Sequence, residues 1–292
     1  MERATFEGHF YETYYFANIV RNVLHDQISY LRLLDNFYGA DPDFEFAQPF
    51  PKYSAFHKFI EFLVTEIIND EVFEIELDVR QDTFERYSHM PIAMNDLRPT
   101  SLPIEKALIY YNIEHTSFVD WLKNLNKEFL DADDNDVSDY YDELTLEGPF
   151  ETLVESAVRE VFFILFQNRG LMLLFNEMMA GLIFGLGADT LEGECDSFFA
   201  KPGVLKRAHI PRWVQRAVYF RDRGLCVICQ RDLSGIINIS SIEHYDHIVP
   251  LAQGGLNDVS NIQLLCQDCN LKKRNNNAQT SSLYEAWYPM ND

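Results

Sequence analysis

Basic residues, cysteine and long apolar runs are all scarce in this sequence. Only 24 Lys and Arg stand against 46 Asp and Glu, so the 292-residue chain has a net charge of −22. As a whole, such a chain repels nucleic acid. Five cysteines are too few for a secreted scaffold built on disulfides. We therefore expect a reducing, cytoplasmic compartment.

No run is apolar enough to cross a membrane. The most apolar stretch, Val161 to Leu186, is interrupted by Arg169, Asn176 and Glu177. It falls short of the ~20 unbroken apolar residues that a membrane span needs. The N-terminus reads M-E-R-A-T-F-E-G and lacks the apolar segment of a secretory signal. We expect no membrane partner.

The charge is divided unevenly along the chain. Residues 1–200 hold 13 basic and 38 acidic residues, a net charge of −25, whereas residues 201–292 hold 11 and 8, a net charge of +3. Residues 201–231 alone carry eight basic residues against Asp222. This division predicts an acidic domain at 1–200 and a domain at 201–292 that faces nucleic acid.

The acidic part is predicted to be mainly helical. Apolar residues recur at intervals of three and four, and Ser54 is placed to cap the second helix. We predict helices at 10–38, 54–70, 103–130, 150–168 and 171–186, and a break of the third near His115 and Thr116 stays open. The last two are expected to pair antiparallel at the heart of the acidic domain.

Two stretches of the acidic part are predicted to be non-helical. Residues 72–79, V-F-E-I-E-L-D-V, alternate apolar and acidic, which is typical of a strand with one buried face. Residues 131–147 are dense in acid and are interpreted as a loop or linker. The run D-A-D-D-N-D also suggests calcium, but it lacks the glycine and glutamate of an EF-hand loop, so a solvated linker is favoured.

Four of the five cysteines form two C-x-x-C pairs separated by 36 residues. Such pairs can place four thiolates around one ion, and a site with four protein ligands has no open position. We predict a structural zinc site; four buried cysteines without a metal are the alternative. The ligands are Cys226, Cys229, Cys266 and Cys269.

A basic helix is predicted just before the first cysteine pair. Pro211 suits its first turn, and Gly224 its end. The arginines expected on its outer face are Arg212, Arg216 and Arg223. The residues expected to face the core are Trp213, Ala217 and Phe220. The arginines are predicted to contact the nucleic-acid backbone, which gives little sequence specificity.

The segment between and after the cysteine pairs has a distinctive order. It reads E-H-Y-D-H-I-V-P-L-A-Q-G-G, then N-I-Q-L-L, then C-Q-D-C-N-L-K-K. Residues 209–276 thereby resemble the HNH endonuclease family, also called ββα-metal nucleases. The resemblance implies a small, zinc-bound, treble-clef-like ββα-metal nuclease domain that hydrolyses DNA. The predicted fold class is therefore mainly α, with this domain following the acidic helical one.

The resemblance also implies roles for individual residues. His247 corresponds to the general base, and Asp246 and Asn270 to the ligands of a catalytic divalent cation. Asn270 stands where the family often has a third histidine, and two oxygen ligands suit Mg²⁺ or Mn²⁺. Asn261 would hold the loop that orients the histidine, although it could equally cap a turn.

Two further expectations concern the geometry of this region. Adjacent strand residues point to opposite faces, so Asp246 and His247 cannot both aim at one phosphate from a flat strand. This implies a bulged or twisted strand, or a metal that is reached from the edge of the strand. Lys272 and Lys273 would contact phosphates; the alternative is a solvated helix end.

The sequence thus predicts a metal-dependent DNA endonuclease. The acidic domain is expected to bind a protein partner, as in a regulated effector of a bacterial restriction or anti-phage defence system, an analogy of architecture. A homodimer would allow cleavage of both strands. The alternative is a zinc-stapled nucleic-acid-binding module without catalysis.

Overall fold

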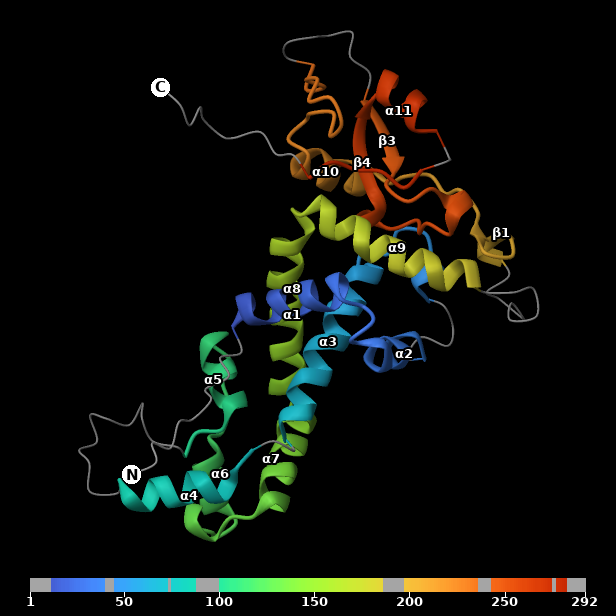
Figure 1. Ribbon diagram of the computed structural model, residues 1–292. Coiled ribbons are helices and arrows are strands. Elements are labelled where there is room, and N and C mark those ends of the chain that lie inside the picture. The colour runs from blue at the N-terminus through green and yellow to red at the C-terminus, as the bar shows by residue number, and fades with distance from the viewer. Residues whose placement is uncertain are drawn as a thin grey trace. The chain divides into compact units, whose positions relative to one another are not determined.

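The computed structural model describes residues 12–39, 45–72, 75–87, 100–185, 197–235, 243–274 and 277–282. Within them the protein is mainly helical, and its two small sheets both follow residue 198 (Figure 1). The predicted fold class is confirmed. Contacts divide the chain into two compact units. The first joins Met1–Ile19 to Ile60–Val161, and the second joins Val20–Phe59 to Phe162–Asp292.

Most of the predicted helices form. The N-terminal helices are α1 (Thr13–His25), α2 (Leu31–Gly39), α3 (Ala55–Val72), α4 (Leu77–Arg86), α5 (Pro103–Tyr110), α6 (Phe118–Asn124), α7 (Asp134–Glu147), α8 (Pro149–Phe166) and α9 (Arg169–Gly185). Ser54 caps α3 as predicted, because its hydroxyl accepts from the backbone N–H of His57 at 3.3 Å. The single helix predicted at 10–38 is instead two helices. The helical stretch predicted at 103–130 is broken between α5 and α6, which includes the break considered near His115 and Thr116.

The strand predicted at 72–79 is wrong. Val72 ends α3, and Leu77 begins α4. Eight residues of alternating apolar and acidic character resemble a strand, but they also fit the end of one helix and the start of the next. No described residue of this stretch pairs with another strand.

The acidic loop predicted at 131–147 is also wrong, since Asp134–Glu147 is helix α7. Asp133 caps α7 by accepting from the backbone of Asn135 and Asp136, and the Asp136 carboxylate accepts in return from the Asp133 N–H. Lys127 pairs with Asp136 at 2.6 Å. The acids that suggested calcium therefore serve as helix caps.

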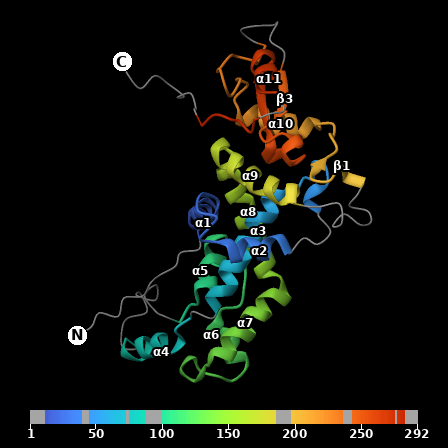
Figure 2. The ribbon, with the colours of Figure 1, turned by 45° about the vertical axis from the view of Figure 1, so that its right-hand side comes forward.

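The second unit contains the strands and the last two helices. Its elements after α9 are β1 (Phe199–Lys201), β2 (Val204–Leu205), α10 (Arg212–Arg221), β3 (Glu243–His247), β4 (Ile262–Cys266) and α11 (Gln267–Lys273). β3 and β4 form an antiparallel hairpin, and α10 and α11 lie beside it in both views (Figures 1 and 2). The basic helix after Pro211 is thereby confirmed.

Helix α9 packs into the second unit rather than into the heart of an acidic domain. Gly254 has φ +84°, and a Cβ there would lie 2.6 Å from the Ala180 carbonyl oxygen of α9, so only glycine permits this approach. Asn176 of α9 donates to the Ser260 hydroxyl at 3.1 Å. The predicted antiparallel pair at the heart of the acidic domain is wrong in this respect.

The N-terminal end of α3 is bound to the same region. Asp258 is fully buried and accepts from the backbone N–H of Ala55 at 2.9 Å and from the Ser260 hydroxyl at 2.7 Å. The N–H of Phe50 donates to the carbonyl of Asn257 at 2.7 Å. The compact unit that holds residues 201–292 therefore also takes in residues from far earlier in the chain. The functional division at residue 200 stays a prediction.

None of the described helices combines the length and apolar character that crossing a membrane requires.

Candidate metal centre and nuclease site

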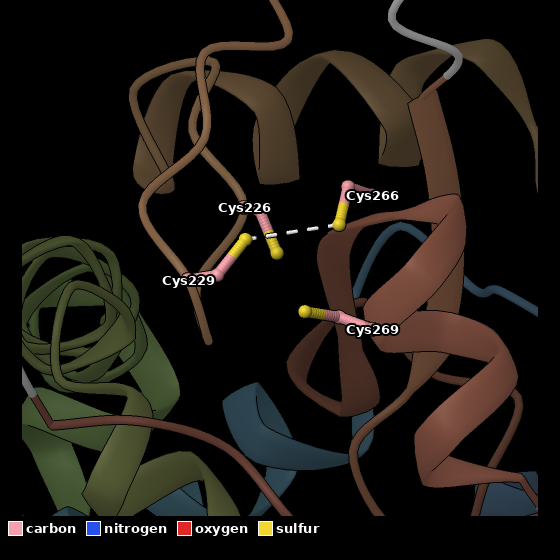
Figure 3. Close-up of side chains that lie close together, drawn as sticks. All are labelled: Cys226, Cys229, Cys266 and Cys269. Atoms are coloured by element: carbon pink, nitrogen blue, oxygen red, sulfur yellow. Dashed lines mark hydrogen bonds between the residues drawn. The ribbon is translucent and has the colours of Figure 1, made fainter.

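The four paired cysteines meet at one point. Their sulfur atoms all lie within 4.8 Å of one another, and the side chains converge from two segments (Figure 3). Cys229 Sγ lies 3.7 Å from Cys266 Sγ. A tetrahedral zinc site with Zn–S bonds of about 2.3 Å has sulfur–sulfur edges of about 3.8 Å. The cluster therefore has the size and the ligand set of a four-thiolate zinc site, as predicted.

The surroundings of these thiols suit metal binding. Burial alone would raise the pKa of the Cys226 thiol, but backbone N–H groups of Cys266 and Cys229 lower it below its ordinary value. Burial raises the pKa of Cys269. A cation bound by these four cysteines would supply the charge that keeps the thiolates ionised. Among the described residues this is the one group of three or more His, Cys, Asp or Glu side chains whose ligand atoms lie close enough to share a metal.

His247 ends strand β3 and is almost completely buried, with 5% of its surface exposed. Burial lowers the pKa of its imidazole to about 4, against the opposing effects of Asn257 and Asp246. The ring is therefore neutral at physiological pH, the form that accepts a proton. Its Nε2 lies 3.3 Å from Asn257 Oδ1.

Asn257 determines which nitrogen of this ring is free. Its Nδ2 donates to the carbonyl oxygen of Lys206 at 2.8 Å, and a carbonyl can only accept. Asn257 Oδ1 is therefore the atom that faces His247, and Nε2 carries the proton of that hydrogen bond. The lone pair of the neutral ring lies on Nδ1, so Nδ1 is the basic atom.

Asn261 braces the loop that follows β3. Its Oδ1 accepts from the Val249 N–H at 2.8 Å, and its Nδ2 donates to the carbonyls of Val249 (3.0 Å) and Leu256 (2.8 Å). Gly255 fits beneath this loop only without a side chain, because a Cβ there would lie 2.0 Å from the Val249 oxygen. The buried Asn261 amide therefore replaces backbone pairing for the segment after His247.

Asp246 and Lys273 form an unexpected ion pair. Lys273, expected to contact phosphate, is buried with 4% of its surface exposed. Its Nζ lies 2.9 Å from Asp246 Oδ2 and donates to the His247 carbonyl at 2.7 Å. Helix α11 packs on the hairpin, so its last turn faces inward and a buried amine must be paired there. Lys272 is exposed.

The strand that carries Asp246 and His247 is regular. The β3–β4 register runs without a shift from Glu243 opposite Cys266 to His247 opposite Ile262. The expected bulge is therefore absent from this described hairpin. The two side chains have different neighbours: Asp246 meets α11, and His247 meets Asn257.

Asp246 and Asn270 carry the oxygen atoms that the predicted divalent cation would need, on two elements that contact each other. The buried Asp246 Oδ2 has its ion pair but no hydrogen bond of good geometry. Asn270 is half-buried on α11, the helix that packs on β3. Its side-chain amide forms no hydrogen bond within the described part of the chain. Carboxylate and amide oxygens are ligands that Mg²⁺ and Mn²⁺ accept.

The exposed and buried faces of the basic helix α10 agree only in part with the prediction. Arg212 and Arg216 are exposed, and Arg223 is exposed just beyond the helix end. Phe220, expected in the core, is 72% exposed. The buried positions are Val214, Val218 and Arg221. The predicted core face is therefore rotated by one position, because the helix turns Arg221 inward and Phe220 outward.

Arg221 enters the interior because buried partners neutralise it. Its guanidinium forms two hydrogen bonds to Asp222, at 2.8 and 3.0 Å, and a third to the Ile262 carbonyl at 2.6 Å. Asp222 also accepts from the Leu264 N–H at 2.9 Å and pairs with Arg169 of α9 at 3.4 Å. This buried Arg169–Asp222–Arg221 triad joins α9, α10 and β4.

The bond from Asn257 to His247 and the inward role of Lys273 were both missed from the sequence. Asn257 stands three residues after Gly254 in G-G-L-N-D. Such a pattern is typical of turns, so its side chain gave no reason to expect a bond to His247. Only the fold brings Lys206, Asn257 and His247 together.

Residues 226–276 match the model of the HNH endonuclease family. The family resemblance of the C-terminal part is confirmed by this match and by the cysteine cluster. No curated protein and no solved structure matches the chain.

Proposed function

Because residues 226–276 carry an HNH endonuclease domain, we propose that the protein is a metal-dependent endonuclease that hydrolyses phosphodiester bonds of DNA. The observation that supports this best is the neutral, buried His247, held through Nε2 by Asn257. A protein that only binds nucleic acid has no need of a desolvated base beside a carboxylate.

In this proposal His247 Nδ1 takes the proton of the attacking water as the water oxygen bonds to phosphorus. The bond from phosphorus to the leaving oxygen breaks, and the leaving oxygen takes a proton from solvent. Asn257 keeps the proton on Nε2, so the basic lone pair stays on Nδ1. Asp246 and Asn270 would hold Mg²⁺ or Mn²⁺, which when bound neutralises the scissile phosphate and the leaving oxygen. Lys273 orients Asp246 and the end of β3 by pairing with the carboxylate and the His247 carbonyl. Asn261 holds the loop that follows β3.

The decisive test is nicking of supercoiled plasmid by the full chain, with and without Mg²⁺ or Mn²⁺. We expect metal-dependent nicking that falls at least about 10²-fold in His247→Ala, since a general base contributes ~10²–10⁴-fold. Asn257→Leu should lose about 10²-fold through misplacement of the ring. His25→Ala is the matched control, because His25 is an exposed histidine at the end of α1 with no role in the proposed site, and it should leave the rate unchanged.

Zinc content and circular dichroism would show that each variant is folded. Equal nicking by wild type and His247→Ala would refute the proposal. Metal-independent DNA binding without any nicking would favour the alternative, a zinc-stapled binding module.

The acidic part is proposed to bind a protein partner. Its net charge of −25 opposes DNA binding, so this part of the chain is expected to serve another purpose. A role in restriction or anti-phage defence, cytoplasmic residence and a homodimer stay predictions that rest on architecture and composition. A fragment starting at residue 201 is unsuited to test regulation, because it lacks Ala55, Arg169 and Asn176, which bind the nuclease part.

A further inference from the structure

A shallow depression of about 330 Å³ lies between α10 and β3. Its volume is at the lower end of the range for small-ligand sites, about 300–1,000 Å³. Five lining residues come from α10, and the sixth from β3. They are Arg212, Gln215, Arg216, Tyr219, Phe220 and Tyr245.

One wall of this depression is positively charged. Arg212 and Arg216 lie one helical turn apart, and both are exposed. Neither guanidinium has an ion-pair or hydrogen-bond partner in the part of the chain that the structure describes. Helix α10 has no acidic residue, in a chain whose net charge is −22. The depression is thus complementary to an anion.

The other wall is aromatic. Phe220 continues the stripe of Arg212 and Arg216 by one more turn, and its ring is 72% exposed. Tyr219 and Tyr245 stand beside it. A single exposed phenyl ring needs no explanation. Here, however, the ring shares one depression with two arginines and two tyrosines.

We propose that this depression binds an unpaired nucleotide, with its base stacked on Phe220 and its phosphates on Arg212 and Arg216. The inference rests on the proposed nuclease function and names a substrate class, DNA with unpaired bases. A simple anion would leave the aromatic wall without a role. In an intact duplex the faces of the bases are covered by their neighbours, so only unpaired bases can stack on a side chain.

The depression is separate from the proposed metal ligands. Tyr245 and Asp246 are consecutive in the regular strand β3, so their side chains point to opposite faces of the hairpin. His247 shares the face of Tyr245, but its ring is buried against Asn257 and is not among the residues that line the depression. Changes at Phe220 should therefore alter binding without removing a group that acts on the scissile phosphate. This separation makes the inference testable apart from catalysis.

The test measures binding by the full-length, cleavage-blocked His247→Ala protein without Mg²⁺ or Mn²⁺. Fluorescence anisotropy would compare a labelled single strand of DNA, about 20 nucleotides long to exceed the ~4–16 nucleotides of typical single-strand sites, with a blunt duplex of the same sequence. We expect Phe220→Ala to weaken single-strand binding about tenfold, since one stacked base is worth roughly that factor or more. Duplex binding should change less than about twofold, and Phe220→Trp should restore the affinity, because only a stacked base depends on the ring.

Further variants separate the contribution of the arginine charge to DNA affinity from that of the Phe220 ring. Arg216→Gln should weaken binding of both DNAs and make the slope of log affinity against log salt shallower by about 0.7–0.9, the value for one phosphate neutralised. Phe163→Ala is the matched control, because Phe163 is also 72% exposed but lies on α8. It should change neither affinity.

Two results would overturn the inference. In the first, Phe220→Ala leaves single-strand binding unchanged, which would make the ring a site for a protein partner or for nothing. In the second, binding of both DNAs is weakened equally. Plasmid nicking by Phe220→Ala with His247 intact is read separately. Its persistence would uphold the nuclease proposal even if the stacking site fails.

Discussion

The buried triad of Arg169, Asp222 and Arg221 allows a quantitative prediction about how the second unit is held together. Asp222→Asn keeps the shape of the side chain but removes its charge. Two guanidinium groups, whose side chains are 4% and 0% exposed, then lack a counter-charge. Breaking such a buried pair costs about 3–5 kcal/mol, because the remaining charge stays desolvated. The amide also matches the hydrogen bonds from Arg221 and Leu264 less well.

A second Asp–Arg pair provides the control. Arg231 and Asp268 also form an ion pair, at 2.9 Å against 2.8 Å for Arg221 and Asp222, but their side chains are 50% and 59% exposed. Exposed pairs contribute about 0–1 kcal/mol. Asp268→Asn should therefore change the free energy of unfolding by less than about 1 kcal/mol.

Thermal and urea unfolding, monitored by circular dichroism and zinc release, would compare the two variants. Asp222→Asn should lower the melting temperature of the zinc-containing unit by roughly 10 °C, and Asp268→Asn by no more than a few degrees. Similar small losses in both variants would show that the triad contributes nothing beyond a surface pair. The claim that α9 is integral to this unit would then lose its energetic support.

Two further predictions concern the metal and acid sensitivity. Removal of zinc by a chelator, or Cys226→Ser, should unfold the 226–274 region, since a structural zinc contributes about 10–16 kcal/mol in small domains; one zinc per chain should be lost by mass spectrometry, and unchanged dichroism without zinc would contradict this. His57 accepts from the Ser54 N–H at 3.1 Å and stacks on Phe162, and burial lowers its pKa to about 4. The unfolded chain then binds more protons between about pH 6.5 and 4, so stability falls as the pH falls through that window, by at most about 3 kcal/mol. His57→Gln should flatten the slope of unfolding free energy against pH, and an identical slope would show that His57 is already free to protonate in the fold.

The zinc ligands and the family of the C-terminal part were predictable because their signals are local. Two residues between cysteines suffice to place both sulfurs on one ion. Pro211 directly precedes α10, where the N–H that proline lacks is not needed, and Ser54 caps α3 through a hydrogen bond to a residue only three positions away. These features depend on neighbours in the chain, which the sequence displays directly.

The wrong predictions arose where a local sequence pattern was compatible with two kinds of secondary structure. In α7 the buried residues follow helical spacing, but the acidic residues between them obscure the helical periodicity of the apolar positions. They are Val137, Tyr140, Tyr141 and Leu144. In 72–79 the alternation is too short to exclude a helix end and a helix start.

The sequence by itself determined the chemistry that is available: four thiols at zinc spacing, a histidine beside a carboxylate, and a local excess of arginine over acid. Tertiary structure alone decided which groups are buried and paired. Lys273 turned inward to Asp246, Phe220 remained outside, and Asn257 met His247. Asp258 reached Ala55, 203 residues earlier in the chain. Interactions over such separations depend on the packing of whole elements, which no local pattern encodes.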